Sequence, residues 1–354
     1  MTRLTPQPDA LTTPPISRRP GRNAAIAFVV LVVAALVPQF VTSPSRLNLA
    51  VLILLAAQLG VAWNILGGYA GQISLGHAAF FGIGAYTATL LFMNFGISPW
   101  IGIPLGGLVS AAIGIVVGWS CFKLKGHYFA MATIAIAEIV QIGFNNWEYA
   151  GAAVGLSLPL AKRGWSVMIF ADKASYYYLA LGLLVLSLLV NFAIERSFLG
   201  YYFRAIKDEP DAARSLGVGL TIFKQIALGA SSFLTAMGGG LYAFKELYID
   251  PPSVLSTGLS IKMALAAILG GVGTLFGPVV GAVILTAIEE GSRALLGGSG
   301  RGTDLILYAL IIIAVAIYYP RGVIGWLIDR RDRRKARGRA AEARRGAGVG
   351  DAAR

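Results

Sequence analysis

Apolar and polar positions divide the chain into long apolar runs separated by short polar connections. Most runs approach the roughly 20 residues with which an α-helix crosses about 30 Å of hydrocarbon. They lack the alternation of apolar and polar positions that is typical of a membrane β-barrel. The pattern predicts an all-α fold, a polytopic transmembrane helical bundle of about ten spans, near residues 24–41, 47–66, 72–94, 99–122, 127–145, 174–194, 223–246, 259–272, 275–291 and 304–320.

Composition supports this interpretation. Hydrophobic residues make up 56% of the chain and charged residues 13%, about half the roughly 25% of a soluble domain. So few charges could not cover the surface of a soluble protein of this length. This argues against a cytosolic enzyme, a nucleic-acid binder and a disordered chain, and it makes membrane lipid the expected surrounding.

Two details of the span count depend on local sequence. The run at 24–41 is expected to remain as a first span rather than to be removed as a signal peptide, because many spans follow it. The eighth and ninth runs are short and are joined by Gly270–Thr274. The count is therefore nine or ten.

The net charge of +13 orients the chain. With the N-terminus in the cytoplasm and ten spans, 22 of the 30 Lys and Arg residues fall on the cytoplasmic side, as the positive-inside rule favours. An odd count would leave one basic tail outside. We therefore expect both termini in the cytoplasm, a disordered basic tail at 1–22, a membrane domain at 23–328 and a basic tail at 329–354.

The segment Gly67–His77 interrupts an apolar region with four glycines and three polar side chains. Non-helical backbone at membrane depth is tolerated where it is buried in protein or lines a water-filled path, and transporters use such breaks. The alternative is a tight glycine turn between two spans. The candidates for a pathway or gating role here are Gly71, Gln72, Ser74 and His77.

A second polar group lies within the run at 127–145. Glu138, Gln141 and Asn145 share one helix face. A carboxyl group within a span is costly and usually faces the bundle interior. Glu138 and Gln141 therefore line the pathway or belong to a structural hydrogen-bond cluster.

The long loop at 195–222 is predicted to be cytoplasmic and to contain a short helix at 208–217. Asp208 can cap its N-terminus, Glu209 and Asp211 suit the positive end of its dipole, and Gly217 can adopt the left-handed conformation after its last turn. So short a helix needs a surface to pack on. Either lipid headgroups or a cytoplasmic partner could supply that surface.

Several stretches resemble one family of membrane proteins. The segment Asp211-Ala212-Ala213 followed by Gly217 looks like the EAA loop of ABC importer permeases, with Asp in place of the usual Glu. The stretch Asn64–Tyr86 resembles the signature of the branched-chain amino acid permeases of the LivM type. Gly270–Pro278 and Gly126–Thr133 are similar to further segments of that family. The resemblance covers roughly residues 45–325.

The resemblance implies a function and a set of partners. The chain would be the permease subunit of an ABC importer for branched-chain amino acids in a bacterial inner membrane. A second homologous permease, two cytoplasmic ATPase subunits and an extracytoplasmic binding protein would complete it. The ATPase would contact a coupling segment formed by Asp208, Glu209, Asp211, Ala212, Ala213 and Gly217.

Other functions remain open at this point. No Gly-Lys pair occurs, so the chain has no Walker A loop, and no catalytic constellation, metal-ligand cluster or cofactor motif is visible. An enzyme is therefore disfavoured. Within the same family the substrate could be urea, a short amide or an aromatic acid, and a stand-alone secondary transporter or channel is the alternative from another class.

Overall fold

The computed structural model describes residues 34–41, 43–124, 126–159 and 164–295, together with Leu310 and Ile313. The chain divides into two compact units, Met1–Thr42 and Ser43–Arg354. In the first unit, residues 34–40 form a helix within the first predicted span. The two predicted tails, and the last predicted span apart from Leu310 and Ile313, lie outside the described residues.

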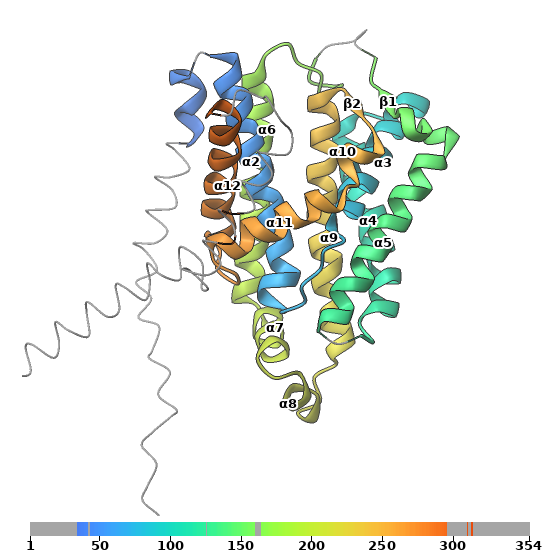
Figure 1. Ribbon diagram of the computed structural model, residues 1–354, viewed down its shortest axis with the longest axis vertical. Helices are drawn as coiled ribbons and strands as arrows, with labels where there is room; N and C mark the ends of the chain where they lie inside the picture. The colour runs from blue at the N-terminus through green and yellow to red at the C-terminus, as the bar shows by residue number, and fades with distance from the viewer. Residues whose placement is uncertain are drawn as a thin grey trace, which may run out of the picture. The chain divides into compact units, whose positions relative to one another are not determined.

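The second unit contains the elements labelled in Figure 1. Its helices and strands are α2 (Pro44–Asn64), a π-helix (Ile65–Tyr69), α3 (His77–Phe95), α4 (Pro99–Cys121), α5 (His127–Asn146), 3-10 turns at Glu148–Ala150 and Ala152–Val154, β1 (Leu156–Ser157), α6 (Lys173–Arg196), α7 (Phe198–Asp208), α8 (Pro210–Ser215), α9 (Leu220–Glu246), β2 (Tyr248–Ile249), α10 (Pro251–Val254), α11 (Thr257–Gly270) and α12 (Gly277–Leu295).

Seven helices within the described residues are long and apolar enough to cross a membrane. They are Pro44–Tyr69, His77–Phe95, Pro99–Cys121, His127–Asn146, Lys173–Arg196, Leu220–Glu246 and Pro251–Gly270. Each coincides with a predicted span. The predicted span at 275–291 is the helix α12, which is not among the seven and which carries Glu289 and Glu290 near its end. The chain is thus a multi-pass helical membrane protein, and the count of ten remains a prediction.

Local sequence explains where several helices begin and end. Pro44 and Pro99 occupy the first positions of α2 and α4, where a missing N–H costs nothing. Gly96 follows α3 with φ +66°, the left-handed conformation that commonly ends a helix. The predicted run at 99–122 agrees with α4 to within one residue, whereas the predicted run at 72–94 begins five residues before α3.

Helices α3, α4 and α9 pack closely because small residues lie between them. A Cβ atom on Gly84 of α3 would overlap the backbone of Ala236 in α9, and one on Gly106 of α4 would lie 3.0 Å from the Gly84 carbonyl oxygen. In lipid, where the hydrophobic effect does not hold helices together, such close approach stabilises the bundle by van der Waals packing.

The two ends of this unit differ. Helices α7 and α8 form a hairpin at one end, and β1, β2 and α10 lie at the other (Figure 1). The strands pair antiparallel, Leu156 with Ile249 and Ser157 with Tyr248. This sheet of two residue pairs is a local addition to the predicted helical bundle, and the sequence pattern gave no signal for strands so short.

Candidate functional site

The predicted interruption after α2 is present. The helix widens into the π-helix at Ile65–Tyr69, and the chain then runs without helical structure from residue 70 to residue 76 before α3 begins at His77. The backbone N–H of Gln72 donates to the Leu66 carbonyl at 3.0 Å, and Gly71 has φ +68°. We call residues 65–76 the interruption.

His77 is fully buried and is held on both ring nitrogens. Its Nδ1 lies 3.1 Å from Ser74 Oγ and its Nε2 lies 2.8 Å from Ser231 Oγ of α9. The single hydroxyl hydrogen of Ser231 is donated to the Ala62 carbonyl at 2.7 Å, so Ser231 must accept from Nε2–H. The contacts therefore assign Nε2 as a hydrogen-bond donor to Ser231, with the Ser74 hydroxyl as the partner of Nδ1.

Side chains from α2, α5 and α11 form hydrogen bonds with backbone groups of residues 74–78, at the end of the interruption and the start of α3. Trp63 Nε1 of α2 donates to the Ser74 carbonyl at 2.7 Å, and Thr133 Oγ1 of α5 accepts from the Leu75 N–H at 3.1 Å. Ser260 Oγ of α11 accepts from the Ala78 N–H at 2.7 Å. These partners replace the missing helical hydrogen bonds, which is the condition under which a membrane protein tolerates non-helical backbone between its spans.

Asn64 ties the interruption to the glycine-rich turn between α11 and α12. Its Oδ1 accepts from the Gly273 N–H at 2.9 Å, and its Nδ2 donates to the Thr274 carbonyl at 3.0 Å. Asn64 is 1% exposed, and Gly273 has φ +76°. This two-point contact joins the two glycine-rich stretches of the sequence, which lie about two hundred positions apart.

Glu138 lies elsewhere and is exposed on α5, where it accepts a short hydrogen bond from Thr257 Oγ1 at the start of α11. Gln141 is half-buried. Of the seven span helices, α5 is the least buried, because only 17% of the residues in its apolar stretch lie inside the structure. The expectation that this carboxyl group faces the interior of its own bundle is therefore wrong, because α5 lies at the edge.

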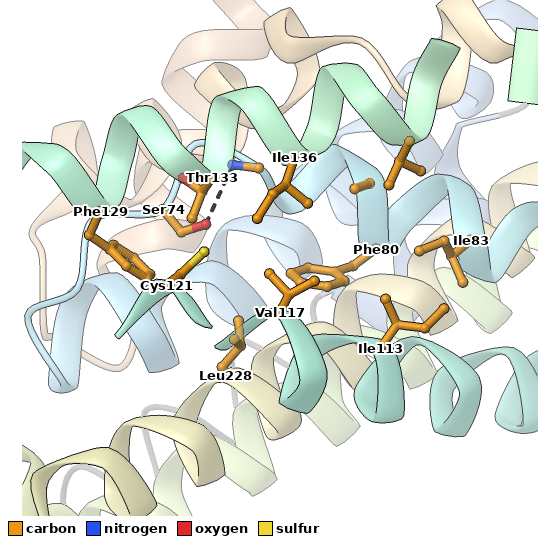
Figure 2. A pocket seen from close by; sticks show the side chains of 13 residues that line it. Ser74, Phe80, Ile83, Ile113, Val117, Cys121, Phe129, Thr133, Ile136 and Leu228 are labelled. Atoms are coloured by element: carbon orange, nitrogen blue, oxygen red, sulfur yellow. Dashed lines mark hydrogen bonds between the residues drawn. The ribbon is translucent and has the colours of Figure 1, made fainter. Parts of the chain in front are cut away.

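A small cavity lies between α5 and the rest of the bundle. Figure 2 shows Phe129, Thr133 and Ile136 of α5 facing Phe80 of α3 and Val117 of α4 across it. Its volume is about 20 Å³, which is room for about one water molecule. A larger apolar pocket of about 240 Å³ between α4, α6 and α9 contains none of the predicted pathway residues.

The predicted pathway residues thus fall into two groups. Gly71, Gln72, Ser74 and His77 lie along the interruption, and Glu138 and Gln141 lie on the exposed edge helix. Within the described residues no hydrogen bond connects Glu138 to Ser74 or His77, and no group of three His, Cys, Asp or Glu side chains is placed to hold a metal ion.

The predicted short helix at 208–217 is in fact the second half of a hairpin. Asp208 is the last residue of α7, and Glu209 takes the N-cap position of α8 without a side-chain capping bond. The predicted cap at Asp208 is therefore wrong. Gly217 follows α8 with φ +84°, as predicted.

The hairpin divides the predicted coupling residues between an inner and an outer face. Ala213 is buried against Ile206 and Leu220, so its small size serves packing within the chain. Asp208, Glu209, Asp211, Ala212 and Gly217 are exposed. Leu216, which sequence reasoning passed over, is 85% exposed at the tip.

Two further polar residues also escaped prediction. Gln58 is fully buried in α2, and its Nε2 donates to the Leu234 carbonyl at 2.8 Å and to Ser187 Oγ at 3.2 Å. Lys207 at the end of α7 donates from Nζ to the Gly68 carbonyl at 2.9 Å. A polar residue in an apolar run was the signal for Gln58, but its partners in α6 and α9 were not visible from local sequence.

These features define a class, that of a multi-pass helical membrane protein. The helices Pro44–Tyr69 and His77–Phe95 are joined by non-helical backbone, and Lys207 ties the end of the first of them to the α7–α8 hairpin. Comparison with known proteins identifies the group within that class. Residues 45–315 match the family described as the permease component of the branched-chain amino acid transport system, and the chain belongs to that family.

Relatives of the chain carry names that fit this family. The chain is 31% identical to the high-affinity branched-chain amino acid transport system permease protein LivM of Salmonella typhimurium, over 83% of this chain and 73% of that protein. It is 30% identical to the LivM protein of Escherichia coli, over 84% and 74%. Identity to the LivH permease protein of Salmonella typhimurium is 24%, over 76% and 91%. No solved structure matches the chain.

Proposed function

We propose that this chain is a permease subunit of an ABC importer that takes up branched-chain amino acids through a bacterial inner membrane. The observation that carries the proposal is the family match over residues 45–315. Relatives at 30–31% identity are named as high-affinity permeases for these amino acids. Two ATPase subunits would drive transport, with a second permease and a binding protein completing the importer.

The proposed orientation places the α7–α8 end in the cytoplasm. Lys123, Arg196, Arg204, Arg214 and Lys224 lie in or next to the connections at that end, as the positive-inside rule favours. Reporter fusions at residue 10 and at residue 350 test the associated prediction that both termini are cytoplasmic. One extracytoplasmic end would refute the ten-span topology.

The α8 tip is the proposed ATPase contact. Leu216 projects from it with 85% of its surface exposed, and Asp211 and Ala212 are exposed beside it. When a partner covers a leucine as exposed as this one, apolar surface is removed from water, which favours binding. Packing against a partner also stabilises a helix as short as α8. Leu216→Asp is expected to abolish co-purification of the ATPase without preventing membrane insertion. The matched control Ser215→Asp places the same charge one position earlier, and equal loss in both variants would contradict Leu216 as the anchor.

The exposed face of α5 is the proposed boundary of the pathway. A carboxylate on a lipid-facing surface within a span would be costly. Glu138 and Gln141 therefore indicate that a polar path or the second permease, and not lipid, covers this face of α5. Glu138→Gln keeps the hydrogen bond from Thr257 and removes the charge. Lost uptake at normal membrane levels would support a pathway role, whereas unchanged uptake would assign Glu138 to structure.

Uptake by the reconstituted importer tests the function as a whole. Liposomes that contain the permease pair, the ATPases and the binding protein should accumulate radiolabelled leucine only when ATP is present on the side of the membrane where the ATPases lie. Unlabelled isoleucine and valine should compete, and urea, short amides and aromatic acids should not. Uptake by the chain alone without an ATPase would instead identify a secondary transporter or channel.

A further inference from the structure

Lys207 joins the α7–α8 hairpin to the interruption. Its ammonium group donates to the carbonyl oxygen of Gly68 in the π-helix at 2.9 Å, across 139 positions of sequence. Because the chain leaves the helical path after Tyr69, no following helical turn supplies an N–H to this carbonyl. A lysine at this point satisfies it and suits the negative end of the helix dipole.

The stem of Lys207 also lies against the glycines of both glycine-rich stretches. A Cβ atom on Gly71 would come within 2.9 Å of Lys207 Cγ, and one on Gly273 would lie 3.3 Å from Lys207 Nζ. Both glycines have positive φ. Lys207 therefore occupies the position where the end of α2, the extended link and the turn before α12 come together.

The hairpin that carries Lys207 is held together by its own apolar contacts. Ile206 of α7, Ala213 of α8 and Leu220 of α9 form one buried cluster. Phe203 lies one helical turn before Lys207 on the same face, is fully buried, and belongs to a cluster with Leu66 and Tyr69 of the π-helix. Phe203 and Lys207 therefore connect the hairpin to the interruption, one by apolar packing and the other by a hydrogen bond.

We propose that Lys207 is a positioning residue that transmits movement of the α7–α8 hairpin to the interruption at residues 65–76. This inference rests on the proposed function, since it takes α8 as the ATPase contact. Phe203 supplies apolar contact in any arrangement, whereas the Lys207 hydrogen bond holds the Gly68 carbonyl in one place. Loss of that bond uncouples the hairpin from the interruption while leaving the hairpin folded.

The first test measures coupling in the reconstituted importer. Lys207→Met keeps the stem and removes the donor, and Lys207→Arg keeps a donor. Arg204→Met is the control for loss of a positive charge from α7, because Arg204 pairs with Glu195 at 3.3 Å and makes no hydrogen bond to residues 65–76 in the described part of the chain. Lys207→Met should lower leucine uptake per ATP hydrolysed roughly threefold to tenfold, the range for a partly exposed hydrogen bond to a charged group. Lys207→Arg should restore much of it, and Arg204→Met should match wild type.

The second test does not depend on transport. In a Cys121→Ala background, Ile73→Cys places a thiol on the extended link, where Ile73 is 53% exposed. Its rate of maleimide labelling in membrane vesicles reports how firmly the link is held. Adding Lys207→Met should raise that rate several-fold, and adding Arg204→Met should leave it unchanged.

The two readouts separate failure of this inference from failure of the proposed function. If no variant transports leucine, the labelling rate still tests the contact. Unchanged labelling at position 73 in Lys207→Met overturns the proposal even when uptake falls, because the effect would then not pass through the interruption. Normal coupling in Lys207→Met overturns it as well.

Discussion

Replacing Asn64 with leucine tests how the two glycine-rich stretches are held together. Leucine has a similar size but can neither accept from the Gly273 N–H nor donate to the Thr274 carbonyl, which Asn64 contacts at 2.9 Å and 3.0 Å. The Asn64 side chain is 1% exposed, and the two backbone groups that it contacts belong to half-buried residues of the turn. The turn before α12 then has two unpaired backbone groups.

The expected cost follows from these two groups. Each hydrogen bond lost from a half-buried backbone group costs about 0.5–1.5 kcal/mol, so the variant loses about 1–3 kcal/mol of unfolding free energy. With a shift of about 2–4 °C for each kcal/mol, the unfolding midpoint falls by at least about 2 °C. Heating the purified chain in detergent, followed by size-exclusion chromatography of the folded fraction, measures that midpoint.

Asn146→Leu is the matched control. Asn146 is exposed on α5, and its Nδ2 donates only within its own helix, to the Ile142 carbonyl at 2.8 Å. That substitution is expected to change unfolding free energy by no more than about 0.5 kcal/mol. If Asn64→Leu has the same midpoint as Asn146→Leu, the amide does not hold the turn and the reasoning fails.

Three further substitutions have expected outcomes that the same thermal measurement checks. Ser231→Ala removes both the acceptor of His77 Nε2–H and the donor to the Ala62 carbonyl and should cost about 1–3 kcal/mol. Ser232→Ala, whose hydroxyl bonds only within α9, should cost less; equal midpoints would contradict a stabilising role for the Ser231 hydroxyl. Gly84→Ala would overlap the Ala236 backbone and should cost about 1–3 kcal/mol by overpacking, while Gly182→Ala, which has open space around it, should be tolerated. Gly217→Val should strain the left-handed position after α8 and cost about 1–2 kcal/mol, and Gly217→Asn should retain most of the stability; an unstrained valine variant would show that the turn adapts.

The spans were predictable because their signal is local. An apolar run bounded by proline or glycine, such as Pro99–Cys121, is recognisable without knowledge of any contact. The interruption was predictable for the same reason, since glycines and polar residues stand within an apolar stretch. The class of site therefore followed from the sequence, although its functional role remains a proposal.

The contacts that organise the site could not be predicted, because they join distant positions. Asn64 and Lys207 look unremarkable until their partners, 209 and 139 positions away, are known.

Local reasoning also misplaced a helix boundary. The Asp208-to-Pro210 sequence suggested a cap at Asp208, but the residue before a proline is driven to extended backbone, and Glu209 has φ −150°. The helix therefore breaks there, α7 ends at Asp208, and Ala213 turns inward.

The small sheet at the end opposite α7 and α8 has a consequence for how the chain is assembled. β1 follows α5, but its partner β2 follows α9, and the Leu158 N–H also donates to the Leu247 carbonyl at 2.8 Å. During synthesis β1 therefore emerges without a partner, and the ladder closes only after α6 and α9 have both been threaded through the bilayer. Pairing between β1 and β2 therefore cannot precede the synthesis of α9, and β1 remains an unpaired strand until then.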